Sequence, residues 1–361
     1  MSLSENQLLM LNILVFTDYI KNGDTVFEIV SRMETDLNQN KPIDTCRMKQ
    51  DEWRKLVDNI KTHPELLTYH VQHYKDDSVS KKNMACFVDD TENPQDVIVV
   101  FRGTLKNDDW RDNGSCCYKA DTQKQMEAAE YVNGLPENYG NNITVTGHSK
   151  GGNKAQYVTV VCSRVKRCVS FDGQGFSKEF IEKYSDKISE KSHCITSVST
   201  AEDYVNSLLL PIAGKRIFVE ADMGNVSHFI EYHKPNILLN EFGELNPPKE
   251  QSEFSRQISD YTSYVLLNVK DSKKGDDIEK LILFFEKMAN VHKKLCRWLL
   301  QPLWDFLMVF ILIFVVMPFK IPIAFGRGIK LLFHFIGADI KFAKEHHRYI
   351  LKQKSVINNS I

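Results

Sequence analysis

The stretch VTGHSKGG, residues 145–152, places one serine between the end of a predicted strand and the start of a predicted helix. A β-branched run leads into it at residues 143–146, and an amphipathic helical pattern follows it. Gly147 and Gly151 flank Ser149 at two positions on either side, and small residues are required there when a strand turns sharply into a helix. The pattern therefore predicts that Ser149 is a nucleophile rather than a serine in a structural Gly-Ser turn.

Strand and helix signals alternate on both sides of this stretch. A polar turn at 91–94 separates two apolar runs, which predicts a hairpin or two neighbouring strands. Residues 1 to about 80 are predicted to be mostly helical, beginning at Ser4. The alternation favours an α/β fold with a mostly parallel central sheet. Strands are predicted at 84–88, 97–101, 143–146, 167–171, 194–199 and 216–220, and helices at 123–131 and 151–164.

Three motifs resemble those of one enzyme family. The strand ending in Phe-Arg-Gly-Thr at 101–104, the Gly-His-Ser-Lys-Gly-Gly elbow at 147–152 and the glycine-rich exit at 169–176 occur in the expected order. In these features the region Ser4 to Leu245 resembles α/β-hydrolases of the class 3 lipase type, in particular a bacterial branch with this elbow. The resemblance implies an α/β-hydrolase fold and a serine hydrolase acting on carboxylic esters.

An oxyanion hole needs two amide donors, one after the nucleophile and one after an earlier strand. Lys150 and Thr104 occupy those positions. The resemblance implies that the Thr104 hydroxyl also contributes, whereas its alternative role is simply to end a β-strand.

The acid is expected in a loop after a later strand, because the chain order in this fold is serine, acid, histidine. Asp203 follows the predicted strand 194–199 and is the expected acid. Glu202 is adjacent to it, and Asp172 ends the preceding strand, so both remain competitors.

The base is expected just after the last strand. His228 comes first there and resembles the family's histidine, and His233 is the alternative. His70 and His73 could share a helix face as metal ligands, but no third ligand is in view and a solvated pair is favoured. The expected mechanism is acyl transfer from Ser149, activated by His228, with no metal or organic cofactor.

Composition excludes some functions. The 361 residues carry a net charge of -1, which argues against a nucleic-acid partner. Eight cysteines without framework spacing indicate reduced thiols and a cytoplasmic setting. The N-terminus lacks the features of a Sec signal peptide, which leaves non-classical export open.

After about residue 245 the strand signals stop. The expected domains are the hydrolase domain at 1–245, a linker region at 246–276 with a helix at 254–269 that could pack on the hydrolase domain, and a helical module at 277–361. The run 306–319 is wholly apolar. With flanking tryptophans and a basic amphipathic segment, it predicts membrane association through residues 298–345, and a soluble helical core is the alternative. The expected function is that of a lipase, esterase or phospholipase, with lipid or other esters as substrates. The alternative is a membrane-interacting or effector protein that uses the hydrolase fold as a scaffold with little or no catalysis.

Overall fold

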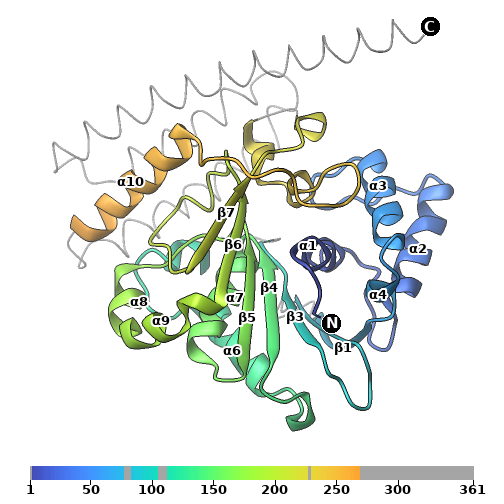
Figure 1. Ribbon diagram of the computed structural model, residues 1–361, viewed down its shortest axis with the longest axis horizontal. Coiled ribbons are helices and arrows are strands. Elements are labelled where there is room, and N and C mark those ends of the chain that lie inside the picture. The colour runs from blue at the N-terminus through green and yellow to red at the C-terminus, as the bar shows by residue number, and fades with distance from the viewer. Residues whose placement is uncertain (1, 77–82, 105–111, 227–228, 269–361) are drawn as a thin grey trace, which may run out of the picture.

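The computed structural model describes residues 2–76, 83–104, 112–226 and 229–268. Within these ranges the centre of the protein is a seven-stranded sheet with the strands in sequence order, β1 to β7 (Figure 1). Strand β2 is antiparallel to both of its neighbours, β1 and β3, and the strands from β3 to β7 are parallel to one another. The predicted α/β class with a largely parallel sheet is confirmed. The strands are His70–Asp76 (β1), Asn83–Val88 (β2), Val97–Phe101 (β3), Ile143–His148 (β4), Val165–Phe171 (β5), Ile195–Thr200 (β6) and Lys215–Val219 (β7).

Helices cover both faces of the sheet (Figure 1). On one face lie α1 (Glu5–Leu14), α2 (Val26–Asn38), α3 (Gln50–Lys61) and α4 (Pro64–Leu67). On the other lie α6 (Gln123–Asn133), α7 (Lys150–Val161), α8 (Lys178–Lys183) and α9 (Ser185–Lys191). The remaining elements are α10 (Glu253–Asn268) and the short 3-10 helices η1 (Glu137–Tyr139), η2 (Ser192–Cys194), η3 (Met223–Asn225), η4 (Phe229–His233) and η5 (Pro235–Leu238).

Strand β3 is apolar throughout because both of its faces are buried. Its Ile98 and Val100 belong to the core cluster that contains α1, whereas Val99 and Phe101 belong to the cluster that contains α6 and α7. Successive side chains of a strand point to opposite faces, so each side chain of β3 packs in one of the two clusters. This explains why the run Val97–Phe101 is continuous rather than alternating.

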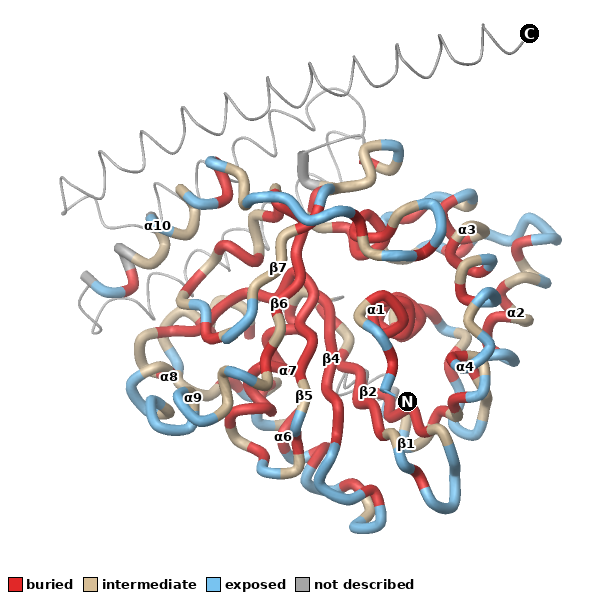
Figure 2. The backbone as a smooth tube through the Cα atoms, viewed as in Figure 1, coloured by how far each residue is buried: buried red, intermediate tan, exposed pale blue. Residues whose placement is uncertain are grey.

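Helix α1 lies at the centre of the molecule. Its residues from Asn6 to Leu14 are all buried, as the red tube in Figure 2 shows. The amide of Asn12 reaches the sheet, where its Nδ2 donates to Oγ1 of Thr146 at 2.8 Å. The helix begins after Ser4, as the sequence predicted, and the main-chain amide of Ser4 donates to Oε1 of Gln7 at 2.9 Å. The helix thus fixes the strand that leads into the Gly-His-Ser stretch.

The prediction that residues 1 to about 80 are mostly helical is wrong for the last part of this range. Residues His70–Asp76 form β1, which pairs with β2 in the antiparallel direction. Because His70 and His73 therefore lie on a strand, they do not share a helix face. His73 has a φ of 52° at a register shift in β1, and its Nε2 lies 3.1 Å from the Tyr139 hydroxyl. Pairing with a neighbouring strand decided this segment, and local propensity did not.

Helix α10 follows the β-rich region, and its contacts tie it to the sheet domain. Leu266 packs with Cys116 and Leu209, and the Ser255 hydroxyl donates to the main-chain oxygen of Asp203 at 2.9 Å. The predicted module at 277–361, including the apolar run 306–319, lies outside the described residues.

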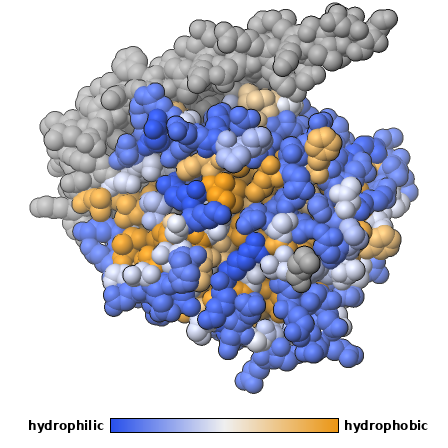
Figure 3. Space-filling model, in the orientation of Figure 1, coloured by the Kyte–Doolittle hydropathy of each residue, from blue (hydrophilic) through white to orange (hydrophobic). Residues whose placement is uncertain are grey.

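The described part of the chain contains no helix with the length and apolarity needed to cross a bilayer. Hydrophilic side chains dominate the face shown in Figure 3, and apolar ones gather towards its middle.

Candidate active site

Ser149 lies on a strained bend between β4 and α7. Its backbone angles are φ 59° and ψ -124°, which non-glycine residues rarely adopt. A Cβ atom added to Gly147 would lie 2.1 Å from the main-chain carbon of Gly151, so no larger residue fits there. Strain of this kind persists only where the surrounding structure enforces it, and it is typical of a serine exposed for nucleophilic attack.

An imidazole ring connects Ser149 to a buried carboxylate. Nε2 of His233 lies 2.8 Å from Oγ of Ser149, and Nδ1 of the same ring lies 2.8 Å from Oδ1 of Asp203. The side chain of Asp203 is fully buried, whereas that of His233 keeps 18% of its surface exposed. This is the order nucleophile, base, acid, in which the acid fixes the tautomer that leaves Nε2 free to accept the serine proton.

The histidine in this arrangement differs from the one expected. His228, the expected base, lies outside the described residues. The position between Ser149 and Asp203 is taken by His233, which the sequence offered as the alternative. Helix η4 ends at His233, whose ring lies beside Ser149. Between β7 and η4 the chain forms η3, and the first histidine after β7, His228, comes before η4.

Neighbouring contacts hold His233 in place. The carbonyl of Tyr232 accepts a hydrogen bond from the Thr200 hydroxyl at 3.0 Å. On the other side, Nζ of Lys234 is buried and lies 2.7 Å from Oε1 of Glu52 on α3. The base is therefore positioned by contacts to β6 and to the N-terminal helices, which the local sequence does not reveal.

The three candidate acids have different environments. Asp203 accepts a second hydrogen bond, at 2.5 Å, from the main-chain amide of Asn206. Glu202 instead forms an ion pair with Lys249 at 2.6 Å. Asp172 is fully buried, and its Oδ2 faces Nε2 of His148 at 3.5 Å rather than the triad histidine's Nδ1. Of the three, Asp203 is the one that hydrogen-bonds to the imidazole beside Ser149.

The two predicted oxyanion donors lie on either side of the nucleophile. Lys150 is the first residue of α7, so its main-chain N–H has no acceptor within the helix. Thr104 follows Gly103, where an added Cβ would lie 3.3 Å from Cβ of Ser149. The Thr104 hydroxyl accepts a hydrogen bond from Asn113 at 2.9 Å. The role of both amides as oxyanion donors stays a prediction.

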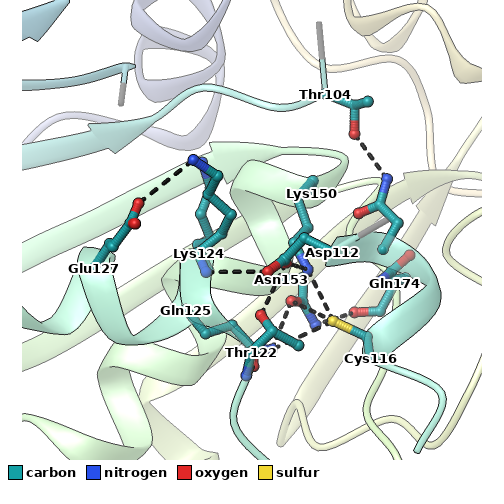
Figure 4. Close-up of polar contacts among 12 residues, drawn as sticks. Thr104, Asp112, Cys116, Thr122, Lys124, Gln125, Glu127, Lys150, Asn153 and Gln174 are labelled. Carbon is teal, nitrogen blue, oxygen red and sulfur yellow. Dashed lines mark hydrogen bonds and ion pairs between the residues drawn. The ribbon is translucent and has the colours of Figure 1, made fainter. Parts of the chain in front are cut away.

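A buried polar network surrounds the side chain of Lys150 (Figure 4), and no pattern in the sequence predicted it. Nζ of Lys150 lies 2.6 Å from Oδ2 of Asp112 and donates to Sγ of Cys116 at 2.8 Å. Asp112 also accepts from the Thr122 hydroxyl at 2.8 Å and from the amide of Lys124 at 3.0 Å. Burial by itself would raise the pKa of Asp112, but the Lys150 charge and these hydrogen bonds outweigh it and lower that pKa. The network ties the segment that begins at residue 112 to the helix that follows the nucleophile.

One group of potential metal ligands exists among the described residues. Single ligand atoms of His148, Asp172 and His233 lie within 4.8 Å of one another. However, both ring nitrogens of His233 are engaged by Ser149 and Asp203, so we assign no metal ligands here.

Solved structures with a distant likeness to this chain include three lipases. M37 lipase is 13% identical, with a TM-score of 0.33 over 57% of this chain and 70% of the lipase. The Rhizomucor miehei lipase propeptide complex is 12% identical, with a TM-score of 0.31 over 51% and 72% of the two chains. Extracellular lipase LipA from Serratia marcescens is 14% identical, with a TM-score of 0.28 over 58% and 42%. No curated protein matches the chain.

A family model described as Mbeg1-like matches residues 36–282. The matched range includes the whole sheet, Ser149, His233 and Asp203. Because the match spans more than half of the chain, the protein belongs to the Mbeg1-like family.

Proposed function

We propose that this protein is a serine hydrolase that cleaves carboxylic esters through an acyl-enzyme. The observation that carries the proposal is the single imidazole of His233, placed 2.8 Å from both the Ser149 hydroxyl and the Asp203 carboxylate. A backbone strained at the serine itself adds to it, because a structural Gly-Ser turn has no need of that conformation.

The reaction follows from the roles of these groups. Nε2 of His233 takes the proton of Ser149 as Oγ attacks the ester carbonyl, and Asp203 stabilises the imidazolium that forms. The main-chain amides of Lys150 and Thr104 would hold the negative oxygen of the tetrahedral intermediate. The imidazolium then protonates the leaving alcohol, and a water molecule activated by the same base releases the acid.

For the substrate we propose lipid esters, cleaved by a membrane-associated enzyme. The proposal rests on the resemblance of the three motifs to class 3 lipases and on the apolar run 306–319 beside a basic amphipathic segment. An enzyme held at a bilayer would meet acyl lipids directly. A series of esters of increasing chain length tests it, since a rise in kcat/KM with chain length is expected from an acyl site of apolar residues.

Covalent labelling by a fluorophosphonate is the first test, since it requires the nucleophile, the base and the oxyanion donors together. We expect labelling of the wild-type protein and none of Ser149→Ala. Ser189→Ala changes an exposed serine on α9 and is the matched control. Labelling and ester turnover that are equal in Ser149→Ala and Ser189→Ala would remove Ser149 from the mechanism. Absence of both from the wild-type protein would favour a scaffold without catalysis.

A further inference from the structure

A second pair of polar side chains lies directly behind the base. Asp172 directly follows β5, is completely buried and has a φ of 48°, in the left-handed region that a non-glycine residue seldom occupies. Its Oδ2 lies 3.5 Å from Nε2 of His148, the residue before the nucleophile. Neither of these two buried atoms has a hydrogen-bond partner among the described residues. Two unpaired buried polar atoms facing each other are costly unless a proton lies between them.

His148 connects this pair to the base. Its ring donates a hydrogen bond to the main-chain carbonyl group of His233, and the two ring centroids are 4.8 Å apart. A neutral imidazole has only one N–H. Nε2 is the ring nitrogen that faces Asp172, so the N–H directed at His233 belongs to the other nitrogen, Nδ1. Nε2 is then an acceptor, and the group facing it has to be the donor.

We propose that Asp172 is a positioning residue: it stays a neutral carboxylic acid, donates its proton to Nε2 of His148, and so fixes the tautomer with which His148 holds the main chain of His233. This inference rests on the proposed function, because it explains how the catalytic base is held. It also gives the two aspartates near the base opposite tasks, with Asp203 carrying the charge and Asp172 carrying a proton.

The charges around the pair support the neutral form. Besides Ser149, four described residues face His233: His148 on β4, Asp172 after β5, Asp203 after β6, and Tyr204, whose ring centroid is 5.9 Å away. Burial, and then the negative charge of Asp203, raise the pKa of Asp172 well above its ordinary value, although hydrogen bonds from Thr200 and Ser199 act in the opposite direction. An ionised Asp172 would be a second buried negative charge, and its hydrogen bond from the amide of Thr200 is a long one of 3.3 Å.

His148 is neutral for a similar reason. Burial, and then the positive charge that His233 can carry, lower the pKa of His148 well below its ordinary value. During turnover His233 becomes an imidazolium, and a second imidazolium stacked 4.8 Å away would oppose that step. An ion pair between Asp172 and His148 would therefore work against catalysis, whereas a neutral hydrogen-bonded pair does not.

The kinetic test compares two substitutions of nearly equal size at the same position. Asp172→Asn keeps a donor for Nε2 of His148, so kcat and the acid limb of the pH profile should stay within about threefold and within about 0.3 pH units of the wild type. Asp172→Leu removes the donor, and kcat should fall by about tenfold or more while KM changes little. The matched variant Asp203→Asn should lose at least about a thousandfold.

The opposite pattern would overturn the proposal. If Asp172 were an anion that assists the base, Asp172→Asn would lose as much activity as Asp172→Leu. The acid limb of its pH profile would also move to lower pH, because removal of a negative charge favours the neutral imidazole.

A spectroscopic measurement decides the question without turnover. Nitrogen-15 NMR of histidine-labelled protein should show His148 as the neutral Nδ1–H tautomer from about pH 5 to about pH 8, with the signal assigned by its loss in His148→Gln. The same tautomer should persist in Asp172→Asn and be lost or mixed in Asp172→Leu. An imidazolium or an Nε2–H tautomer at position 148 in the wild type refutes the inference. If the wild type neither reacts with a fluorophosphonate nor cleaves esters, the proposed function fails, and the NMR result still stands or falls by itself.

Discussion

Replacing His233 by asparagine is the sharpest test of the site. The substitution removes the ring whose two nitrogens lie 2.8 Å from Ser149 and from Asp203. A positioned general base contributes up to about 10⁴-fold, and each tenfold is about 1.36 kcal/mol, so we expect kcat/KM to fall by roughly 10⁴-fold, or about 5.4 kcal/mol of transition-state stabilisation. The free energy of unfolding should fall by only about 1–2 kcal/mol, because a net hydrogen bond is worth about 1 kcal/mol.

The assay is hydrolysis of p-nitrophenyl butyrate, with thermal unfolding of each variant measured in parallel. His228→Asn is the matched control, since it changes the other histidine of the same segment. We expect its kcat/KM to stay within about twofold of the wild type. The reverse result, a large loss in His228→Asn with activity kept in His233→Asn, would show that the imidazole beside Ser149 is not the base.

Three further predictions concern the surroundings of the nucleophile. Lys150→Met leaves the buried Asp112 unpaired and should lower the free energy of unfolding by about 3–5 kcal/mol in urea titrations, whereas the double variant with Asp112→Leu should recover most of that loss. If both variants are equally unstable, the ion pair is not the cause. The pKa of Asp112 is lower in the folded protein than in the unfolded chain. Its stabilising contribution is therefore fully present above the unfolded pKa of about 3.9 and is lost as the pH falls through the folded value. The unfolding free energy of Asp112→Asn should consequently change less on acidification than that of the wild type. Gly147→Ala forces a Cβ to within 2.1 Å of Gly151 and should cost at least about 3 kcal/mol or prevent folding, and a melting temperature equal to that of the wild type would contradict the bend described here.

Local sequence was enough to predict six of the seven strands of the sheet, β2 to β7. The β2 and β3 pair was predicted at 84–88 and 97–101, and β3 was observed at Val97–Phe101 with β2 starting one residue earlier, at Asn83. These runs are readable because strands buried on both faces are continuously apolar and are bounded by turn residues. The segment His70–Asp76 was missed because its polar residues carry no such pattern, and pairing with β2 made it a strand.

The nucleophile was predictable from the sequence because a sharp bend imposes a local requirement. A Cβ at position 147 would clash with the main chain of Gly151, only a few residues away, so this requirement for glycine can be recognised as a short motif in the sequence. The order of strands likewise placed Asp203 in a loop beyond the elbow, where it now contacts the base.

The choice between two histidines and the contacts behind the base depended on the tertiary structure alone. The sequence favoured His228 and left His233 as the alternative, and the path of the chain through η3 and η4 places His233 beside Ser149. The pairs Lys150 with Asp112 and His148 with Asp172 join residues 38 and 24 positions apart, respectively. No local spacing encodes such a contact, because it exists only once the sheet has brought the ends of its parallel strands to one edge.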